Sequence, residues 1–220
     1  MLARQVLGIL VAAALPPAAS LVAEAAIPSA AADPCPDIEV IFARGTGGSG
    51  LGQVGSVFVD ALRSRVGSHS LATYSVNYPA SFDFQQSAPL GAADAADRAQ
   101  WMAANCPNTK LVLSGISQGA GVISLITANP GPYGKYTATP MSAQVADHVA
   151  AVAVFGNPMR NIPGGGPLNE LSTVYGAKTI DLCAPDDLFC SSGLSLSAHF
   201  SYAENGMTDE AADFVAGRVQ

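Results

Sequence analysis

The segment 110–128 constrains the fold more than any other part of the chain. It begins with a short apolar run at residues 111–113, the pattern of a strand that is buried on both faces. A Gly-Ile-Ser-Gln-Gly sequence follows, and then an apolar stretch of helix length. So tight a connection between strand and helix requires small residues on both sides of Ser117, and Gly115 and Gly119 satisfy this requirement. The segment therefore predicts a buried parallel strand, a sharp turn at Ser117, and a helix.

Four further segments have the pattern of strands, and helix-length segments separate them along the chain. The predicted strands are residues 38–42, 71–77, 111–113, 149–155 and about 178–182, and the predicted helices are residues 52–66, 90–105 and 208–219. Residues 131–140 are expected to form a loop, because they are rich in Pro, Gly and Tyr. Strands that alternate with helices form a parallel sheet with helices on both faces. The fold class is therefore predicted to be α/β, with a five-stranded parallel sheet.

Residues 1–32 have the features of a secretory signal peptide. Arg4 supplies a positive start, an apolar run covers residues 6–15, and an Ala-rich stretch leads to a small-x-small cleavage site that ends at Ala32. Cleavage after Ala25 is the alternative. The apolar run is too short for a membrane span, and no cysteine in this region could carry a lipid anchor. The protein is therefore expected to be secreted, into the extracellular space or the cell wall, as a single domain of residues 33–220.

Charge and composition exclude several classes of function. The net charge is −7 and only 12% of the residues are charged, which argues against binding to nucleic acid. No C-x-x-C pair or histidine cluster indicates a metal site. The Gly-rich loop after the first strand lacks the lysine and the glycine spacing of nucleotide-binding loops, so no cofactor is expected. The length of the mature chain suits a compact monomer without a large lid.

A serine at such a turn becomes nucleophilic only with a base, which in turn needs an orienting acid. On a parallel α/β sheet, base and acid lie on loops at the carboxyl ends of the strands. Of the three histidines, His69 and His148 directly precede predicted strands, whereas His199 follows the last strand. Ser117 and His199 are therefore the predicted nucleophile and base.

The acid has several candidates. Asp181, Asp186 and Asp187 all end or follow the fifth strand, and chemistry alone does not separate the last two. A serine nucleophile with a histidine base typically carries out acyl transfer. The tetrahedral intermediate of that reaction also needs hydrogen-bond donors aimed at its oxyanion. One of them is expected to be the backbone N–H of Gln118, the residue after the nucleophile.

Three stretches of the chain, residues 40–46, 106–120 and 181–190, resemble the cutinase family, and especially the cutinase-like proteins of actinobacteria. The resemblance covers the whole mature chain, and its most specific motifs are Gly-x-Ser-Gln-Gly and Cys-x3-Asp-x2-Cys.

The resemblance implies a role for several residues. The fourth residue after the first cysteine of the last pair, Asp187, is implied to be the acid, and Asp186 then becomes a solvated turn residue. His199 fits the family histidine. Thr46 stands where the family commonly has a serine that supplies a second oxyanion donor.

The function implied by the resemblance is a secreted serine esterase that cleaves lipid or polyester carboxylic esters through an acyl-enzyme. Two alternatives remain open: an acyltransferase of the cell envelope that uses the same triad, and a lipid-binding surface antigen with little activity. Residues 78–86 and 157–171 differ from the fungal cutinases, so the natural substrate is not implied.

Four cysteines in an exported chain predict two disulfides. Cys35 and Cys106 each precede a strand, and these two strands are neighbours in a sheet of order 2-1-3-4-5. Neighbouring parallel strands start at the same edge and lie about 4.8 Å apart, which a disulfide can bridge. Cys183 and Cys190 lie at the opposite edge. The predicted pairing is therefore Cys35–Cys106 and Cys183–Cys190.

Overall fold

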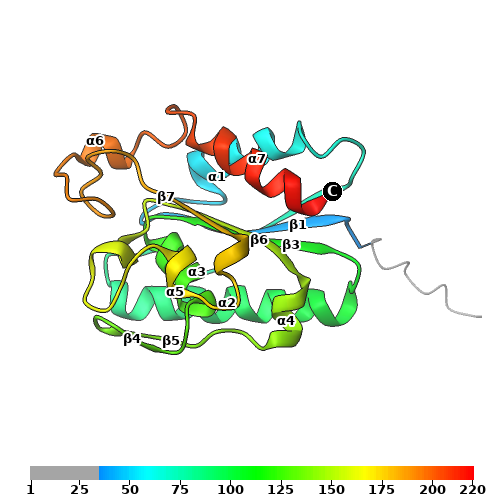
Figure 1. Ribbon diagram of the computed structural model, residues 1–220, viewed down its shortest axis with the longest axis horizontal. Helices are drawn as coiled ribbons and strands as arrows, with labels where there is room; N and C mark the ends of the chain where they lie inside the picture. The colour runs from blue at the N-terminus through cyan, green and yellow to red at the C-terminus, as the bar shows by residue number, and fades with distance from the viewer. Residues whose placement is uncertain (1–34) are drawn as a thin grey trace, which may run out of the picture. The chain divides into compact units, whose positions relative to one another are not determined.

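The computed structural model describes residues 35–220; the predicted signal peptide, residues 1–32, lies outside the described residues. A five-stranded parallel sheet forms the centre of the described domain (Figure 1). Its order is β2-β1-β3-β6-β7, which confirms the 2-1-3-4-5 order expected from the sequence. The strands are β1 (Ile38–Ala43), β2 (Leu71–Ser75), β3 (Lys110–Ile116), β6 (Val149–Phe155) and β7 (Thr179–Leu182).

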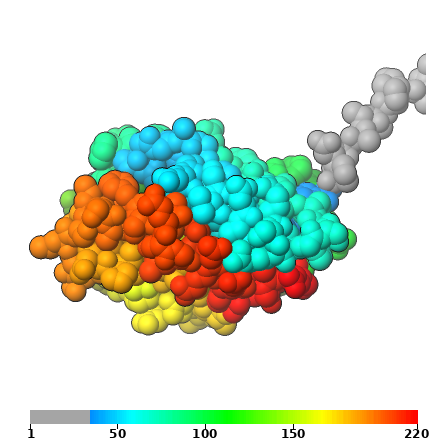
Figure 2. Space-filling view, turned by 90° about the horizontal axis from the view of Figure 1, so that it is seen from above, coloured from blue at the N-terminus to red at the C-terminus, as the bar shows by residue number. Residues whose placement is uncertain are grey.

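Helices cover both faces of this sheet, as predicted. Figure 1 shows α1 and α7 on one face and α2, α3 and α4 on the other. Figure 2 shows α7, in red, beside the residues of α1, in light blue to cyan. Arg65, two residues after the end of α1, donates to Asp209 and Asp213 of α7. The helices are α1 (Gly52–Arg63), α2 (Phe84–Asn105), α3 (Gln118–Thr127), α4 (Ala143–His148) and α7 (Met207–Val219).

The two faces of the sheet bury two separate apolar clusters. Successive residues of a strand point to opposite faces, so Ile41 and Ala43 of β1 pack on the side of α2 and α3. Ile38, Val40 and Phe42 pack on the side of α1 and α7. A strand buried on both faces needs apolar residues at every position, which explains the continuous apolar runs in the sequence.

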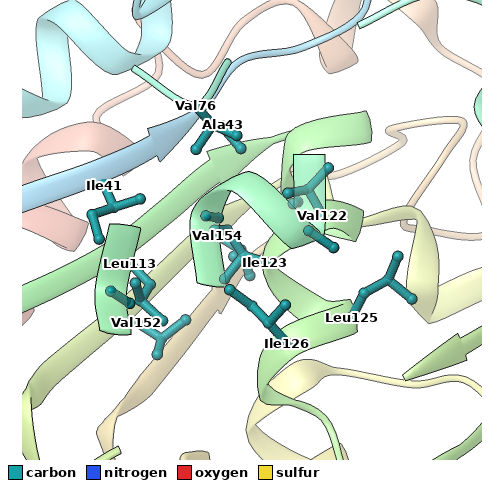
Figure 3. Close-up of a cluster of buried hydrophobic side chains, with 14 of the residues drawn as sticks. Ile41, Ala43, Val76, Leu113, Val122, Ile123, Leu125, Ile126, Val152 and Val154 are labelled. Atoms are coloured by element: carbon teal, nitrogen blue, oxygen red, sulfur yellow. The ribbon is translucent and has the colours of Figure 1, made fainter. Parts of the chain in front are cut away.

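The cluster under α3 determines where this helix lies. Figure 3 shows apolar side chains of α3 in contact with the sheet. The residues labelled from α3 are Val122, Ile123, Leu125 and Ile126, and those from the sheet are Ile41, Ala43, Leu113, Val152 and Val154. Because α3 begins directly after Ser117, this packing also fixes the position of the turn that carries the serine.

Several predicted boundaries differ from the structure, among them the end of the helix predicted at residues 52–66, which lies at Arg63. The helix predicted at residues 90–105 begins at Phe84, because the Asp83 side chain accepts a hydrogen bond from Gln86 N and caps it. Pro89 lies inside this helix, although proline usually ends or kinks one. The predicted strand 71–77 ends at Ser75.

The prediction of a loop at residues 131–140 is wrong. The strands β4 (Gly131–Tyr133) and β5 (Tyr136–Ala138) pair there as an antiparallel hairpin. Gly134 occupies the turn with a φ of 59°, a conformation that glycine adopts without steric cost. Short helical segments also occur within expected loops: η1 (Pro158–Asn161), α5 (Leu168–Leu171), η2 (Gly176–Lys178) and α6 (Leu196–His199).

The disulfides of the structure have the pairing expected from the sequence. Cys35 and Cys106 are joined before β1 and β3, with their Cα atoms 5.5 Å apart. Cys183 and Cys190 close a short loop after β7, with their Cα atoms 5.8 Å apart. Within residues 35–220, no helix has the length and hydrophobicity needed to cross a membrane.

Candidate active site

Ser117 lies at the turn between β3 and α3 in a conformation that an L-residue rarely adopts. Its φ is 56° and its ψ is −121°, which costs of the order of 1–3 kcal/mol for a residue with a side chain. Two backbone hydrogen bonds hold the turn: Ser117 N donates to Phe155 O at 2.9 Å, and Gly121 N donates to Ser117 O at 3.1 Å. The surrounding fold therefore maintains a strained serine at the carboxyl edge of the sheet.

The glycines on either side of Ser117 are required by close backbone contacts. A Cβ atom on Gly119 would lie 1.9 Å from the carbonyl oxygen of Ala43, and one on Gly115 would lie 2.4 Å from that of Gly119. Both distances are far below van der Waals contact. The crowding of strand and helix that the sequence predicted is therefore present, and no side chain fits at either position.

The close contact at Gly119 predicts that alanine is tolerated differently at two glycines of α3, Gly119 and Gly121. Gly119→Ala should lower the free energy of unfolding by about 3 kcal/mol, because the backbone must shift to accept the methyl group. Gly121→Ala is the matched control, since its Cβ would meet only Pro158 Cγ at 3.8 Å. Alanine favours a helix interior by up to about 1 kcal/mol over glycine, so the control should be as stable as the native chain or more stable. Urea unfolding of both variants measures this, and equal stabilities would contradict the proposed crowding.

His199 and Asp187 form a buried pair close to this turn. His199 is the last residue of α6, and its Nδ1 lies 2.8 Å from Asp187 Oδ2. Both side chains are buried. A carboxylate oxygen only accepts hydrogen bonds, so Nδ1 carries the hydrogen and Nε2 is the acceptor of the neutral ring. The sequence placed His199 in a loop, and the structure places it in a short helix.

Backbone pairing between two loops brings the carboxylate to the histidine. Asp187 forms an isolated parallel bridge with Ser195, the N-cap residue of α6. Ser195 N donates to Asp186 O at 2.8 Å. The Cys183–Cys190 disulfide closes the same loop from its two ends. These connections fix the distance between the loop after β7 and the helix that carries His199.

The two adjacent aspartates have different environments. Asp187 is completely buried, and its Oδ1 accepts a hydrogen bond from Phe189 N at 2.7 Å. Asp186 is exposed and has a φ of 63°. The backbone turn at Asp186 therefore directs only Asp187 toward His199, a distinction that chemistry alone left open in the sequence.

Asp187 has one further partner that the sequence analysis missed. The hydroxyl of Tyr202 donates to Asp187 Oδ2 at 2.6 Å. The sequence signal for this contact is the short spacing between His199 and Tyr202, three residues, which keeps the tyrosine close to the histidine that Asp187 contacts.

The other titratable candidates lie elsewhere. His69 and His148 precede β2 and β6, and neither lines the cavity at Ser117. Asp181 is paired with Arg160 at 2.9 Å and also accepts hydrogen bonds from Asn157 and from the backbone of Leu168. This carboxylate therefore anchors the segment after β6 and does not contact His199.

A cavity of about 660 Å³ brings the candidate residues together. Ser117 and His199 line it, and so do Thr46 and Gln118, the two predicted oxyanion donors. Most of the remaining lining is apolar, and Phe82 and Phe200 at its rim are 83% and 68% exposed. The cavity therefore offers an open and largely apolar surface beside the serine.

Hydrogen bonds hold both oxyanion candidates in place. Gln118 is buried; its Nε2 donates to Ser81 O at 2.8 Å, and its Oε1 accepts from Ser87 Oγ at 3.0 Å. The loop that carries Thr46 is fixed by Gly47 N, which donates to Ala80 O at 2.8 Å. Arg44 stabilises the same loop by donating to Gly48 O at 2.7 Å and to Val76 O at 3.0 Å. The backbone amides near Ser117 are thus preorganised.

Ordinary packing gives no reason to hold a serine at positive φ beside an open cavity, whereas serine hydrolases of the α/β-hydrolase fold hold their nucleophile in this way. The comparisons with known proteins narrow this class. The model of the cutinase family matches residues 34–219. The chain belongs to the cutinase family of serine ester hydrolases, as its motifs predicted.

Curated relatives and solved structures agree with this assignment. Carboxylesterase Culp1 of Mycobacterium tuberculosis is 50% identical over 196 residues, which cover 87% of this chain and 85% of that protein. Phospholipase Culp4 of the same organism is 48% identical over 211 residues, with 96% and 90% covered. A cutinase of Trichoderma reesei, solved in complex with a phosphonate inhibitor, is 33% identical, with 86% of this chain and 78% of that chain covered and a TM-score of 0.67.

Proposed function

We propose that this protein cleaves carboxylic esters with Ser117 as nucleophile, His199 as general base and Asp187 as the residue that orients His199. The observation that carries this proposal is the hydrogen bond between His199 Nδ1 and the buried Asp187 carboxylate, because His199 lines the same cavity as the strained Ser117. Membership of the cutinase family supports it independently.

In the proposed reaction, Ser117 Oγ attacks the ester carbonyl carbon while His199 Nε2 takes its proton. The carbonyl oxygen becomes an oxyanion, which the backbone N–H of Gln118 and the N–H or hydroxyl of Thr46 stabilise. Collapse of this intermediate breaks the ester bond, and the imidazolium gives its proton to the departing alkoxide. Water, deprotonated by His199, then attacks the acyl-enzyme by the same route and releases the carboxylic acid.

Lipid esters are the proposed substrate class. Apolar side chains dominate the cavity wall, and a long acyl chain gains about 0.8 kcal/mol for each methylene that it buries. The names of the two mycobacterial relatives, a carboxylesterase and a phospholipase, agree with this class. The predicted signal peptide and the two disulfides support secretion of the protein, which would bring it into contact with substrates outside the cell.

A second cavity of about 450 Å³ extends the apolar surface away from Ser117. Leu125 of α3 and Tyr136 of β5 line both cavities, so the two lie next to each other at these side chains. The wall formed by α2 continues from Ala88 in the first cavity to Ala92 and Ala96 in the second. These alanines lie at intervals of four residues, on one side of the helix. The distal part of a long acyl chain is proposed to lie in this extension.

An ester series with a blocked extension tests the proposed substrate class. Ala93 is exposed and lines the second cavity, so Ala93→Phe should obstruct it without disturbing the core. We expect the ratio of kcat/KM for p-nitrophenyl palmitate to that for the butyrate to fall about tenfold, the effect of exposing roughly two methylenes. Ala104→Phe, an exposed position of α2 that lines neither cavity, is the control. An unchanged ratio in Ala93→Phe would exclude the extension as an acyl site.

A further inference from the structure

We propose that Tyr202 is a positioning residue that holds the Asp187 carboxylate against His199; this inference rests on the proposed triad. The Tyr202 hydroxyl donates to Asp187 Oδ2 at 2.6 Å. His199 Nδ1 lies 2.8 Å from the same oxygen. Both donors therefore act on one atom of a single carboxylate, whose other oxygen is bound by Phe189 N.

The environment of Asp187 makes each of these hydrogen bonds important. Its side chain is completely buried, so water does not reach it to replace a missing donor. A buried carboxylate that loses a partner pays the full cost of its desolvation, which exceeds the net value of an ordinary hydrogen bond. Three donors from three positions of the chain restrict both the position and the rotation of this carboxylate.

Tyr202 is itself held so that its hydrogen points to Asp187. The backbone N–H of Ala184 donates to the Tyr202 hydroxyl oxygen at 2.9 Å, which leaves the hydroxyl hydrogen for the carboxylate. The ring is fully buried and packs edge to face with Phe155 and His199, at centroid distances of 6.0 and 6.3 Å. Its orientation is therefore determined by packing and does not depend on the hydrogen bond alone.

Burial and the neighbouring carboxylate keep Tyr202 protonated. Both effects raise the pKa of its hydroxyl well above the ordinary value of a tyrosine, first through desolvation and then through the hydrogen bond to Asp187. Tyr202 is therefore a donor at every pH at which an esterase works. It does not exchange protons with the triad.

The Tyr202 hydroxyl also affects how the charge of the Asp187 carboxylate acts on His199. Hydrogen bonds to a carboxylate spread its negative charge and lower its basicity. Removing the hydroxyl should therefore alter how Asp187 acts on His199, and the pH–rate profile should change.

The other charged groups near His199 stay the same when the Tyr202 hydroxyl is removed. Asp181 remains paired with Arg160, and Asp186 and Glu204 are exposed to water. Arg44 lines the cavity and donates to backbone carbonyls of its own loop and of the segment after β2. A shift in the profile would thus report the contact between Tyr202 and Asp187.

The test is Tyr202→Phe in the full mature chain, which keeps the ring and removes the hydroxyl. We expect kcat for p-nitrophenyl butyrate to fall at least tenfold with KM unchanged, and the pH–rate profile to differ from that of the native protein. Tyr175→Phe is the matched control. Tyr175 is equally buried, and within residues 35–220 it is the side chain whose buried hydroxyl has no hydrogen-bond partner. This control should keep the native kcat and the native profile.

NMR spectroscopy of His199 provides a readout that does not depend on turnover. The Nδ1–H resonance of His199 should change in Tyr202→Phe and stay unchanged in Tyr175→Phe. An unaltered kcat, pH profile and Nδ1–H resonance in folded Tyr202→Phe would overturn the inference. If Asp187→Asn is inactive in the same assay, that result leaves the proposed triad intact; if Asp187→Asn is fully active, the triad itself is wrong.

Discussion

Asp187→Asn should lose on the order of 10⁴-fold in kcat, as Ser117→Ala and His199→Ala should, because members of a triad act as a unit. An asparagine in place of Asp187 would present either its amide to His199 or an oxygen without charge. The tautomer of His199 would then no longer be fixed, and the imidazolium formed during attack would lose its counter-charge. Steady-state hydrolysis of p-nitrophenyl butyrate measures the loss.

Asp186→Asn is the matched control for this prediction. The two carboxylates are adjacent in the chain, but Asp186 is exposed and has a φ of 63°. Asparagine tolerates this left-handed conformation better than most residues, so the substitution should not disturb the backbone. Activity should remain within about twofold of the native value. If Asp186→Asn were as damaging as Asp187→Asn, the assignment of the acid would be wrong.

Removal of one disulfide should mainly lower stability, and removal of the other should mainly lower activity. Cys35 and Cys106 are 71 residues apart in sequence, whereas Cys183 and Cys190 are only 7 apart. On the chain-entropy model these loops contribute about 4 and about 2.5 kcal/mol, respectively. Replacing Cys35 and Cys106 with serine should therefore lower the Tm by roughly 10 °C and leave most of the activity at 25 °C.

The shorter disulfide closes the loop that carries Asp187. Replacing Cys183 and Cys190 with serine should lower kcat at least tenfold, because the carboxylate loses its fixed distance from His199, while the Tm falls less than in the other double variant. Calorimetry and steady-state kinetics on both variants give the comparison. Equal losses of activity in the two would show that the loop does not depend on its disulfide.

The parts of the fold that follow from local pattern were predictable from the sequence. A strand buried on both faces must be apolar at every position, so β6 at Val149–Phe155 was evident as a continuous run. The turn at Ser117 was evident because only glycine fits beside it, and the distances at Gly115 and Gly119 give the reason. The order of the strands and the cysteine pairing followed from the rules that govern parallel connections.

Local pattern was misleading where a distant contact decides. The hairpin of β4 and β5 has the composition of a loop, and Thr139 N and Met141 N, just beyond it, donate to carbonyls of α3. The helix α2 begins at Phe84, five residues before Pro89, with Asp83 as its N-cap. Neither feature has a periodic signal in the sequence.

The sequence by itself determined the α/β class, the nucleophile candidate and the histidine at the correct edge of the sheet, because each depends on spacing along one segment or on elimination among few residues. The resemblance implied Asp187 and not Asp186 as the acid, but only the tertiary structure shows why Asp187 alone contacts His199, and only it brings Tyr202 to the same carboxylate. Asp186 and Asp187 are chemically identical, and their difference arises from the backbone bridge between Asp187 and Ser195. Such a bridge joins two irregular loops through backbone atoms, which carry no side-chain pattern, and it therefore exists only in the folded chain.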